Sequence, residues 1–159
     1  QDSLRLNWER KAFVRGASTI TQQVVRLAFL DREKKLLRKF REVLGAVLLE
    51  TLLTKKEILE WYINIVSFGV GVYGVGVAAQ YFFDKEIAAL TINDSIQLAL
   101  VLPGPNVQSK QLLNRKLTPY GVKRFFQIAQ QLRNNGYITE KQFHHSVATG
   151  DFGLPVKEL

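Results

Sequence analysis

The chain has 159 residues, 47% of them apolar, and its 22 Lys plus Arg against 14 Asp plus Glu give a formal net charge of +8. This size and composition predict one folded domain with a real core and exclude a disordered chain. The absence of Cys excludes a disulfide framework and thiolate metal sites. The positive charge favours an anionic partner, such as nucleic acid, phospholipid headgroups or a phosphorylated substrate, without choosing among them.

The sequence contains no segment long enough to span a membrane, and its first residues show no export signal. No run approaches the ~20 apolar residues that a membrane span needs. The first residues contain no start Met and no signal-peptide core. We therefore interpret the chain as a piece of a longer protein, whose membrane anchor would lie upstream of Gln1. The two histidines, His144 and His145, would point about 100° apart on a helix, a poor start for a zinc site.

Helix-start signals recur along the chain, and almost nothing alternates with period two. Thr19 and Gln22 have the spacing of a capping box before an apolar run. A long helix fits residues 33–53. One broad arc of this helix is apolar and comprises Leu36, Leu37, Phe40, Val43, Leu44, Val47 and Leu48. The opposite stripe carries Arg38, Glu42 and Gly45, with Lys39 beside them.

Further helices begin at capping signals, which are Thr54 with Glu57, Thr91 with Asp94, Thr118 with Pro119, and Thr139 with Gln142. The glycine-rich stretch 69–76 interrupts the first of these helices, and a short helix near 77–83 follows. The second ends before Pro103, residues 106–117 form a polar, basic connection, and Gly136 closes the third. These elements predict a mainly α fold without repeats.

Gly69, Gly71 and Gly74 match the letters of a dinucleotide-binding fingerprint. That fingerprint requires a preceding strand and a βαβ setting, whereas a capped helix precedes it here. Asp94, at about the right distance, has a simpler role as an acid in the first turn of a helix. We therefore prefer a flexible or close-packed loop for this segment.

The segment 18–23 carries five polar side chains around one Ile. Ser18 or Thr19 could simply cap a helix, with Gln22 and Gln23 exposed, but capping uses two of the five. Hydroxyls and amides at a helix N-terminus also suit a sugar or an anion, because free N–H groups point there. This segment alone leaves both interpretations open.

The segment from Arg38 to Glu42 is charged, and Arg26 adds a cation one turn after Gln22. A solvated face with an i,i+4 pair between Arg38 and Glu42 explains the segment, and by itself is the favoured explanation. Alternatively, the cations hold phosphate while the carboxylate works on a nearby sugar. Farther along, Asn64 shares a helix face with Glu60, but near a helix end it can be merely a cap.

Taken in order, these segments resemble the motifs of the peptidoglycan glycosyltransferase family, glycosyltransferase family 51. Gly16–Gln23 resembles the second motif, Arg38–Glu42 the third, Lys55–Asn64 the fourth and residues 68–83 the fifth. The match runs from about Asn7 to the last helix. Four motifs in the family's order form a strong signal, which overturns the preference for a solvated face at Glu42.

The resemblance implies one lysozyme-like, mainly α domain over residues 1–159, truncated at its N-terminus, on the outer (periplasmic or extracellular) face of the bacterial cytoplasmic membrane. Such enzymes polymerise lipid II into glycan strands, with inversion and release of undecaprenyl pyrophosphate. The implied partners are lipid II, the growing strand, the membrane surface and other cell-wall synthases, but no nucleic acid. No cofactor is certain, and a divalent cation, Mg²⁺ or Mn²⁺, at the pyrophosphate is left open.

The resemblance also implies a role for each candidate residue. Glu42 matches the second family carboxylate, which orients the acceptor or stabilises the pyrophosphate. Cations would stabilise the charge that develops on the pyrophosphate as it leaves, and the candidate residues for this role are Arg26, Arg38 and Lys39. The donor cleft would be lined by Ser18, Thr19, Gln22 and Gln23, with Asn64 supporting it.

Two departures from the family pattern stand out. The first motif, which carries the general base, is missing, and the surroundings of Glu9 do not resemble it, so this chain alone should polymerise nothing. Asp84 stands where the family more often has Gly.

Two other hypotheses stay open: a non-catalytic homologue that binds lipid-linked precursor or a synthase partner, and a basic helical nucleic-acid-binding module. The latter should cluster its charges on one recognition helix, whereas they are spread along the chain.

Overall fold

The computed structural model describes residues 18–30 and 35–148. These residues form helices and one two-stranded hairpin, which confirms the mainly α fold. The chain divides into two compact units, residues 1–65 and 66–159, and the single domain stays a prediction beside them. Within the described ranges, no helix combines the length and the apolar character that crossing a membrane requires.

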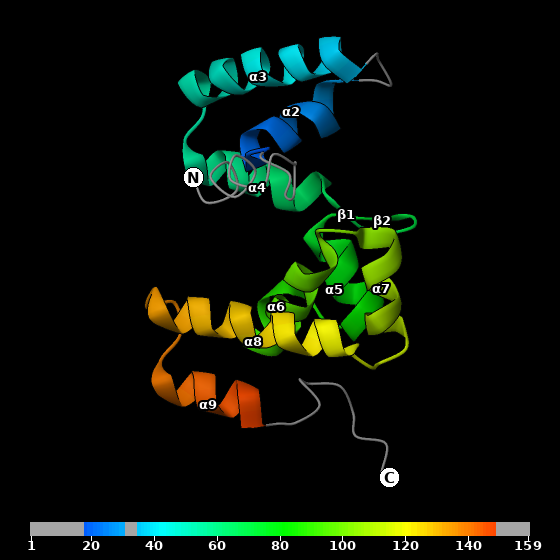
Figure 1. Cartoon of the computed structure of the whole chain (residues 1–159), viewed down its shortest axis with the longest axis vertical. Helices are drawn as coiled ribbons and strands as arrows, with labels where there is room; N and C mark the ends of the chain where they lie inside the picture. The colour runs from blue at the N-terminus through cyan, green and yellow to red at the C-terminus, as the bar shows by residue number, and fades with distance from the viewer. Residues whose placement is uncertain (1–17, 31–34, 149–159) are drawn as a thin grey trace, which may run out of the picture. The chain divides into compact units, whose positions relative to one another are not determined.

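In its described part, the first unit consists of α2 (Ile20–Phe29), α3 (Lys35–Leu52) and α4 (Lys55–Ile65). Helix α2 packs between the other two (Figure 1). Both predicted capping boxes form: the hydroxyl of Thr19 accepts from the Gln22 amide at 3.2 Å, and that of Thr54 accepts from the Glu57 amide at 3.3 Å. The predicted long helix is confirmed over α3, while residues 33 and 34 lie outside the described ranges.

Helix α3 turns its charged stripe, and not its apolar arc, toward α2. Glu42 is only 4% exposed and Ala46 only 8%, whereas the seven apolar residues of the arc are 41% to 89% exposed. Gly45, on the same stripe, has Val25 of α2 directly above it. The solvated face considered from the sequence is therefore wrong for Glu42.

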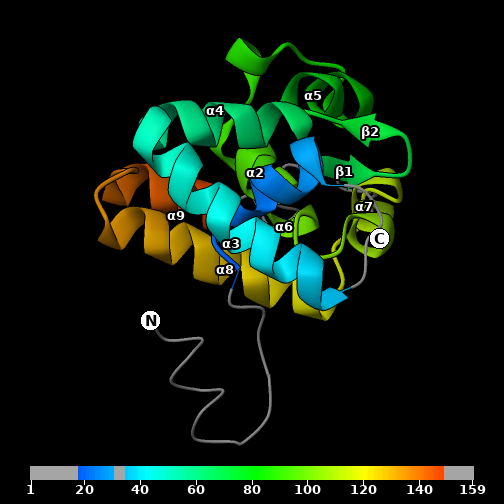
Figure 2. The same cartoon turned by 90° about the horizontal axis from the view of Figure 1, so that it is seen from above.

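The second unit begins with a hairpin and continues through helices. Its elements are β1 (Ser67–Gly69), β2 (Val72–Tyr73), α5 (Val75–Phe83), the 3-10 helix η1 (Ile87–Ala89), α6 (Ile92–Val101), α7 (Pro105–Leu113), α8 (Pro119–Asn134) and α9 (Glu140–Ala148). The core of this unit is formed by Ile96, Leu100, Phe125, Ala129, Ile138 and Phe143. Strand β1 lies against α7 (Figure 2).

The glycine-rich stretch forms this hairpin, and not the loop that the sequence predicts. Strands β1 and β2 pair antiparallel, and Gly71 and Gly74 have φ values of 75° and 81°, which favour glycine. Only the close packing is confirmed, since a Cβ at Gly69 would lie 3.2 Å from Ser109 Oγ. An antiparallel pair is not the βαβ setting of a dinucleotide site.

The polar connection predicted over residues 106–117 is wrong, because most of it belongs to α7. Gly104 stands at the N-cap of α7 and Pro105 in its first turn, and Ser109, Gln111 and Leu112 are buried. The buried Gln111 carbonyl oxygen accepts from the Thr118 amide at 2.8 Å. Polar residues in this stretch are thus satisfied inside the unit, which composition alone cannot reveal.

The predicted caps at Thr91, Thr118 and Thr139 all form. In the Thr91 cap, the Asp94 carboxylate accepts from the Thr91 amide at 2.9 Å, so its role as a first-turn acid is confirmed. Gly136, with φ of 74°, follows the end of α8 as predicted.

Candidate functional site

Five of the predicted site residues lie together where the first turns of α2 and α3 meet. We call Ser18, Gln22, Arg38, Lys39 and Glu42 the Lys39 cluster. Lys39 Nζ donates to Ser18 Oγ at 2.9 Å, to Gln22 Oε1 at 3.3 Å and to Glu42 Oε2 at 2.9 Å. The second and third motifs, far apart in sequence, therefore meet at one ammonium group.

Glu42 is the buried centre of this cluster. Its side chain is 5% exposed, with Lys39 on one oxygen and Arg38 Nε 3.4 Å from the other. Arg38 Nε is itself buried and makes no hydrogen bond to any described residue. Two cations against one buried carboxylate leave the cluster with a net positive charge, so it suits an additional anion.

The first turn of α2 adds to this positive potential. Thr19 is the N-cap, which confirms capping for this residue, and its hydroxyl is engaged by the Gln22 amide. Ser18 precedes the cap and holds Lys39. The N-terminus of a helix carries a partial positive charge and favours phosphate groups.

Within the described residues, three of the predicted site residues, Gln23, Arg26 and Asn64, make no side-chain hydrogen bond or ion pair to this cluster. Gln23 accepts from the Tyr62 hydroxyl at 3.5 Å, on the side of α2 that faces α4. Burial raises the pKa of Tyr62, and the charge of Arg26 opposes this rise, which places Arg26 near the same ring. Asn64 donates to the Glu60 carbonyl of its own helix at 2.8 Å, as expected of a residue near a helix end.

Sequence reasoning missed a second polar group in the first unit. Thr21 Oγ1 donates to Glu50 Oε1 at 2.6 Å, and Lys55 Nζ lies 2.6 Å from the same oxygen. One signal for it exists in the sequence, because Glu50 is a single charge within the apolar second half of α3. Nothing local indicates that Thr21 would be its partner.

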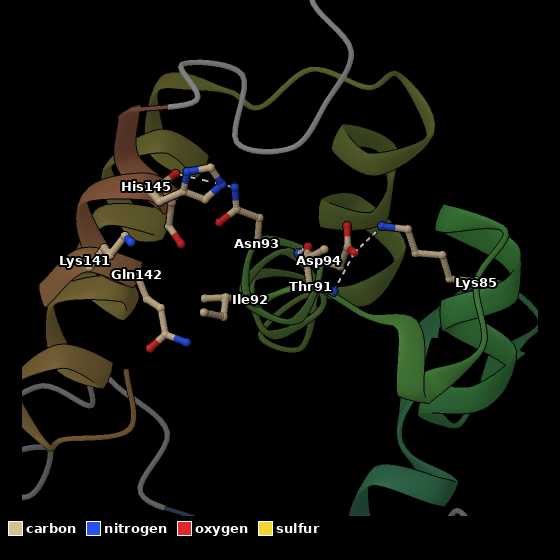
Figure 3. Close-up of a pocket in the computed structure, with 9 residues that line it drawn as sticks. Lys85, Thr91, Ile92, Asn93, Asp94, Lys141, Gln142 and His145 are labelled. Atoms are coloured by element: carbon tan, nitrogen blue, oxygen red, sulfur yellow. Dashed lines mark hydrogen bonds and ion pairs between the residues drawn. The ribbon is translucent and has the colours of Figure 1, made fainter. Parts of the chain in front are cut away.

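A cavity of about 480 Å³ lies in the second unit and contains no predicted site residue. Figure 3 shows it between the start of α6 and one face of α9, with Lys85 beside Asp94. Lys85 Nζ contacts Asp94 Oδ2 at 2.6 Å, and Asp94 also belongs to the cap of α6. These bonds connect Lys85, just before η1, to the first turn of α6. We assign them a structural role and no catalytic one.

The donor set at the Lys39 cluster does not fit a divalent cation. Over residues 18–30 and 35–148, no group of three or more His, Asp or Glu side chains gathers that could hold a metal ion. Glu42 supplies one carboxylate, and both of its oxygens already face cations.

Comparison with known proteins agrees with the motifs. The family model described as "Transglycosylase" matches residues 2–124, across both units. A biosynthetic peptidoglycan transglycosylase of Paraburkholderia xenovorans is 41% identical over 135 residues, which cover 82% of this chain and 55% of that protein. Penicillin-binding protein 1A of Escherichia coli is 40% identical over 129 residues, which cover 80% of this chain but 15% of that protein.

A relative from Bacillus subtilis is also similar, and here too the match covers only part of that protein's length. Penicillin-binding protein 1F of Bacillus subtilis is 38% identical over 129 residues, or 81% of this chain and 18% of that protein. The chain thus spans about half the length of the Paraburkholderia transglycosylase and less of the others. Since the family model covers most of the sequence, the chain belongs to the transglycosylase family.

Proposed function

We propose that the protein is a peptidoglycan glycosyltransferase that polymerises lipid II into glycan strands, with inversion and release of undecaprenyl pyrophosphate. The observation that carries this proposal is the Lys39 cluster, in which two cations, a carboxylate and a helix N-terminus converge in a transglycosylase-family chain. The names of the relatives supply the kind of polymer that is made, peptidoglycan.

The chemistry of the pyrophosphate leaving group explains why cations would be needed at this site. Breaking the bond between the sugar and pyrophosphate leaves negative charge on phosphate oxygens, and cations held near those oxygens stabilise the transition state. The Lys39 side chain is 49% exposed, so its ammonium can exchange a protein partner for a phosphate oxygen. Arg38, one turn from Glu42 on the same stripe, supplies a second positive charge, and Ser18 and Gln22 offer polar contacts to sugar or phosphate.

Glu42 acts as the group that orients these cations. Its carboxylate already accepts from Lys39 and faces Arg38, so little of it is left to take a proton from the attacking sugar hydroxyl. A general base near the acceptor is still required. The carboxylates of Glu50 and Glu57 are engaged by Lys55 and Thr54 respectively. Following the family's first motif, we propose that the base lies outside the described residues.

The exposed arc of α3 supports a location at a membrane surface, which we propose, from the family resemblance, to be the outer face of the cytoplasmic membrane. Seven apolar residues, 41% to 89% exposed, form one side of an 18-residue helix. Apolar helix faces of this kind insert into the interface of a bilayer, and a chain of net charge +8 is attracted to anionic headgroups. A lipid-linked substrate reaches its enzyme from such a surface. Contacts with other cell-wall synthases stay a prediction.

The test uses the full natural protein and lipid II, with glycan strands followed by gel electrophoresis. Glu42→Gln keeps the size of the side chain but removes the charge that orients Lys39 and Arg38, so polymerisation should be abolished. Glu57→Gln is the matched control, because Glu57 belongs to the cap of α4 and should leave turnover unchanged. Normal strand synthesis by Glu42→Gln would overturn the role of Glu42, and lipid II binding by the wild type without turnover would favour the non-catalytic homologue.

A further inference from the structure

The first turn of α2 is held from two directions by one helix. Lys39 and Glu50 are 11 residues apart on α3, a distance of about 16 Å along a helix axis. They nevertheless contact residues only three positions apart at the start of α2, which are Ser18, just before the N-cap, and Thr21 in the first turn. The two long side chains therefore converge on a single turn from opposite ends of α3.

The contact at Thr21 joins all three helices of the first unit. Thr21 is 4% exposed, and its hydroxyl donates to Glu50 Oε1, which also faces Lys55 in the first turn of α4. Hydrogen bonds from Lys55, and then from Thr21, hold the pKa of Glu50 below its ordinary value. Glu50 is therefore ionised near neutral pH and can accept both bonds.

A pivot lies between these two contacts. Val25 rests on Gly45 near the middle of α3 and would keep α2 attached if either polar contact were lost. Rotation about that point would move the start of α2 most, because Ser18 lies farthest from Val25 along the polar segment. The bond from Thr21 to Glu50 opposes this rotation on the side away from Lys39.

We infer that Thr21, Glu50 and Lys55 are positioning residues for glycosyl transfer, which hold the first turn of α2 so that Ser18 and Gln22 meet Lys39 at one point. None of the three belongs to the Lys39 cluster, and each acts through α2. The inference rests on the proposed function.

If these bonds served only to stabilise the fold, their loss should have only a small effect. The side chains of Lys55 and Glu50 are 75% and 39% exposed, and an exposed ion pair of this kind contributes little to folding. A positioning role predicts instead that turnover falls while the fold persists. The two possibilities therefore differ in what a mild substitution does to kcat.

The experiment compares Thr21→Val, Thr21→Ser and Glu50→Gln in the full natural protein. Thr51→Val is the matched control for the first, because the Thr51 hydroxyl donates to the Leu48 carbonyl of its own helix at 2.7 Å. Glu57→Gln is the control for the third. Each variant is assayed for kcat and KM with lipid II, for thermal unfolding, and for hydrogen exchange in a peptide that covers residues 18–23.

We expect Thr21→Val and Glu50→Gln to lower kcat by roughly tenfold with a smaller change in KM, since small misplacements of positioning groups are costly in rate. Exchange in residues 18–23 should accelerate in both variants, Thr21→Ser should restore most of kcat, and both controls should match the wild type in kcat and in exchange of residues 18–23. Unchanged kcat and unchanged exchange would overturn the inference while leaving the proposed function intact.

Loss of kcat that Thr21→Ser fails to restore, with normal exchange in residues 18–23, would also overturn it. If the wild-type protein makes no glycan, the proposed function fails, and the exchange measurement alone decides whether Glu50 holds the first turn of α2.

Discussion

Gly45 in α3 lies directly against Val25 in α2: a Cβ at position 45 would stand 2.7 Å from Val25 Cγ1. Val25 is 4% exposed and β-branched, so it has little freedom to turn away. A glycine inside a helix costs about 1 kcal/mol relative to alanine, and this close approach explains why one is present. It brings α2 near enough for Lys39 and Glu50 to reach the same turn.

The first prediction tests this contact with Gly45→Ala. Overpacking costs about 1–3 kcal/mol, while the gain in helix propensity returns about 1 kcal/mol. The variant should therefore be destabilised by up to about 2 kcal/mol in the wild-type background. After Val25→Ala, which removes the obstructing methyl groups, Gly45→Ala should become stabilising. Denaturant unfolding of the four proteins of this cycle gives the answer, and the same sign in both backgrounds would contradict the close contact.

The second prediction concerns the charge of Lys39. Lys39→Met should lower turnover of lipid II by about 100- to 1,000-fold, the usual loss when one group that stabilises developing charge is removed. Lys56→Met, on the exposed first turn of α4, is the control and should turn over normally. Lys39→Met also leaves the buried Glu42 with Arg38 alone, so adding Glu42→Gln should recover stability but not activity. Recovery of activity in the double variant would contradict the electrostatic role.

Local signals explain how much of the fold the sequence predicts. In each confirmed cap, at Thr19, Thr54, Thr91 and Thr139, donor and acceptor stand three residues apart, so the pattern contains the whole interaction. The hairpin at β1 and β2 was missed because two short strands show no useful alternation. Helix α7 was missed because its buried Gln111 is satisfied by Thr118, which lies beyond the end of the helix.

The candidate site, too, can be predicted from the sequence only in part. Family motifs indicate Ser18, Lys39 and Glu42, but not that Lys39 is the point where they meet. Glu42 is buried while the apolar arc is exposed, which is the opposite of what the hydrophobic pattern of α3 predicts. That pattern describes one helix and not its neighbours. The bond between Thr21 and Glu50 joins residues 29 positions apart, and no periodicity in the chain encodes it.

The third prediction is a dependence of stability on pH at the cap of α4. Bonds from the Thr54 amide and hydroxyl hold the pKa of Glu57 below its ordinary value of 4.5. The unfolded chain therefore binds this proton more readily, so the stabilisation is complete above pH 4.5 and is lost as the pH falls through the lower, folded-state value. Glu57→Gln keeps the capping geometry without titrating. The free energy of unfolding of the wild type should exceed that of Glu57→Gln near neutral pH, and the difference should shrink in acid; a difference that does not change with pH would contradict the assignment.

The fourth prediction follows from Asp84, which ends α5 in the left-handed conformation with φ of 54° and ψ of 44°. Its amide donates to the carbonyls of Ala79 and Gln80, and Gln80 Nε2 donates back to its carboxylate. A side chain in this conformation costs about 1–2 kcal/mol, and the exposed Gln80 contact offsets only part of it. Asp84→Gly should therefore stabilise the protein by roughly 0.5–1 kcal/mol, whereas Asp84→Ala keeps the strain, loses the contact and should destabilise it. Turnover of lipid II should not change in either variant, because Asp84 lies outside the Lys39 cluster. Equal or lower stability of Asp84→Gly in denaturant unfolding would mean that the bond to Gln80 outweighs the strain.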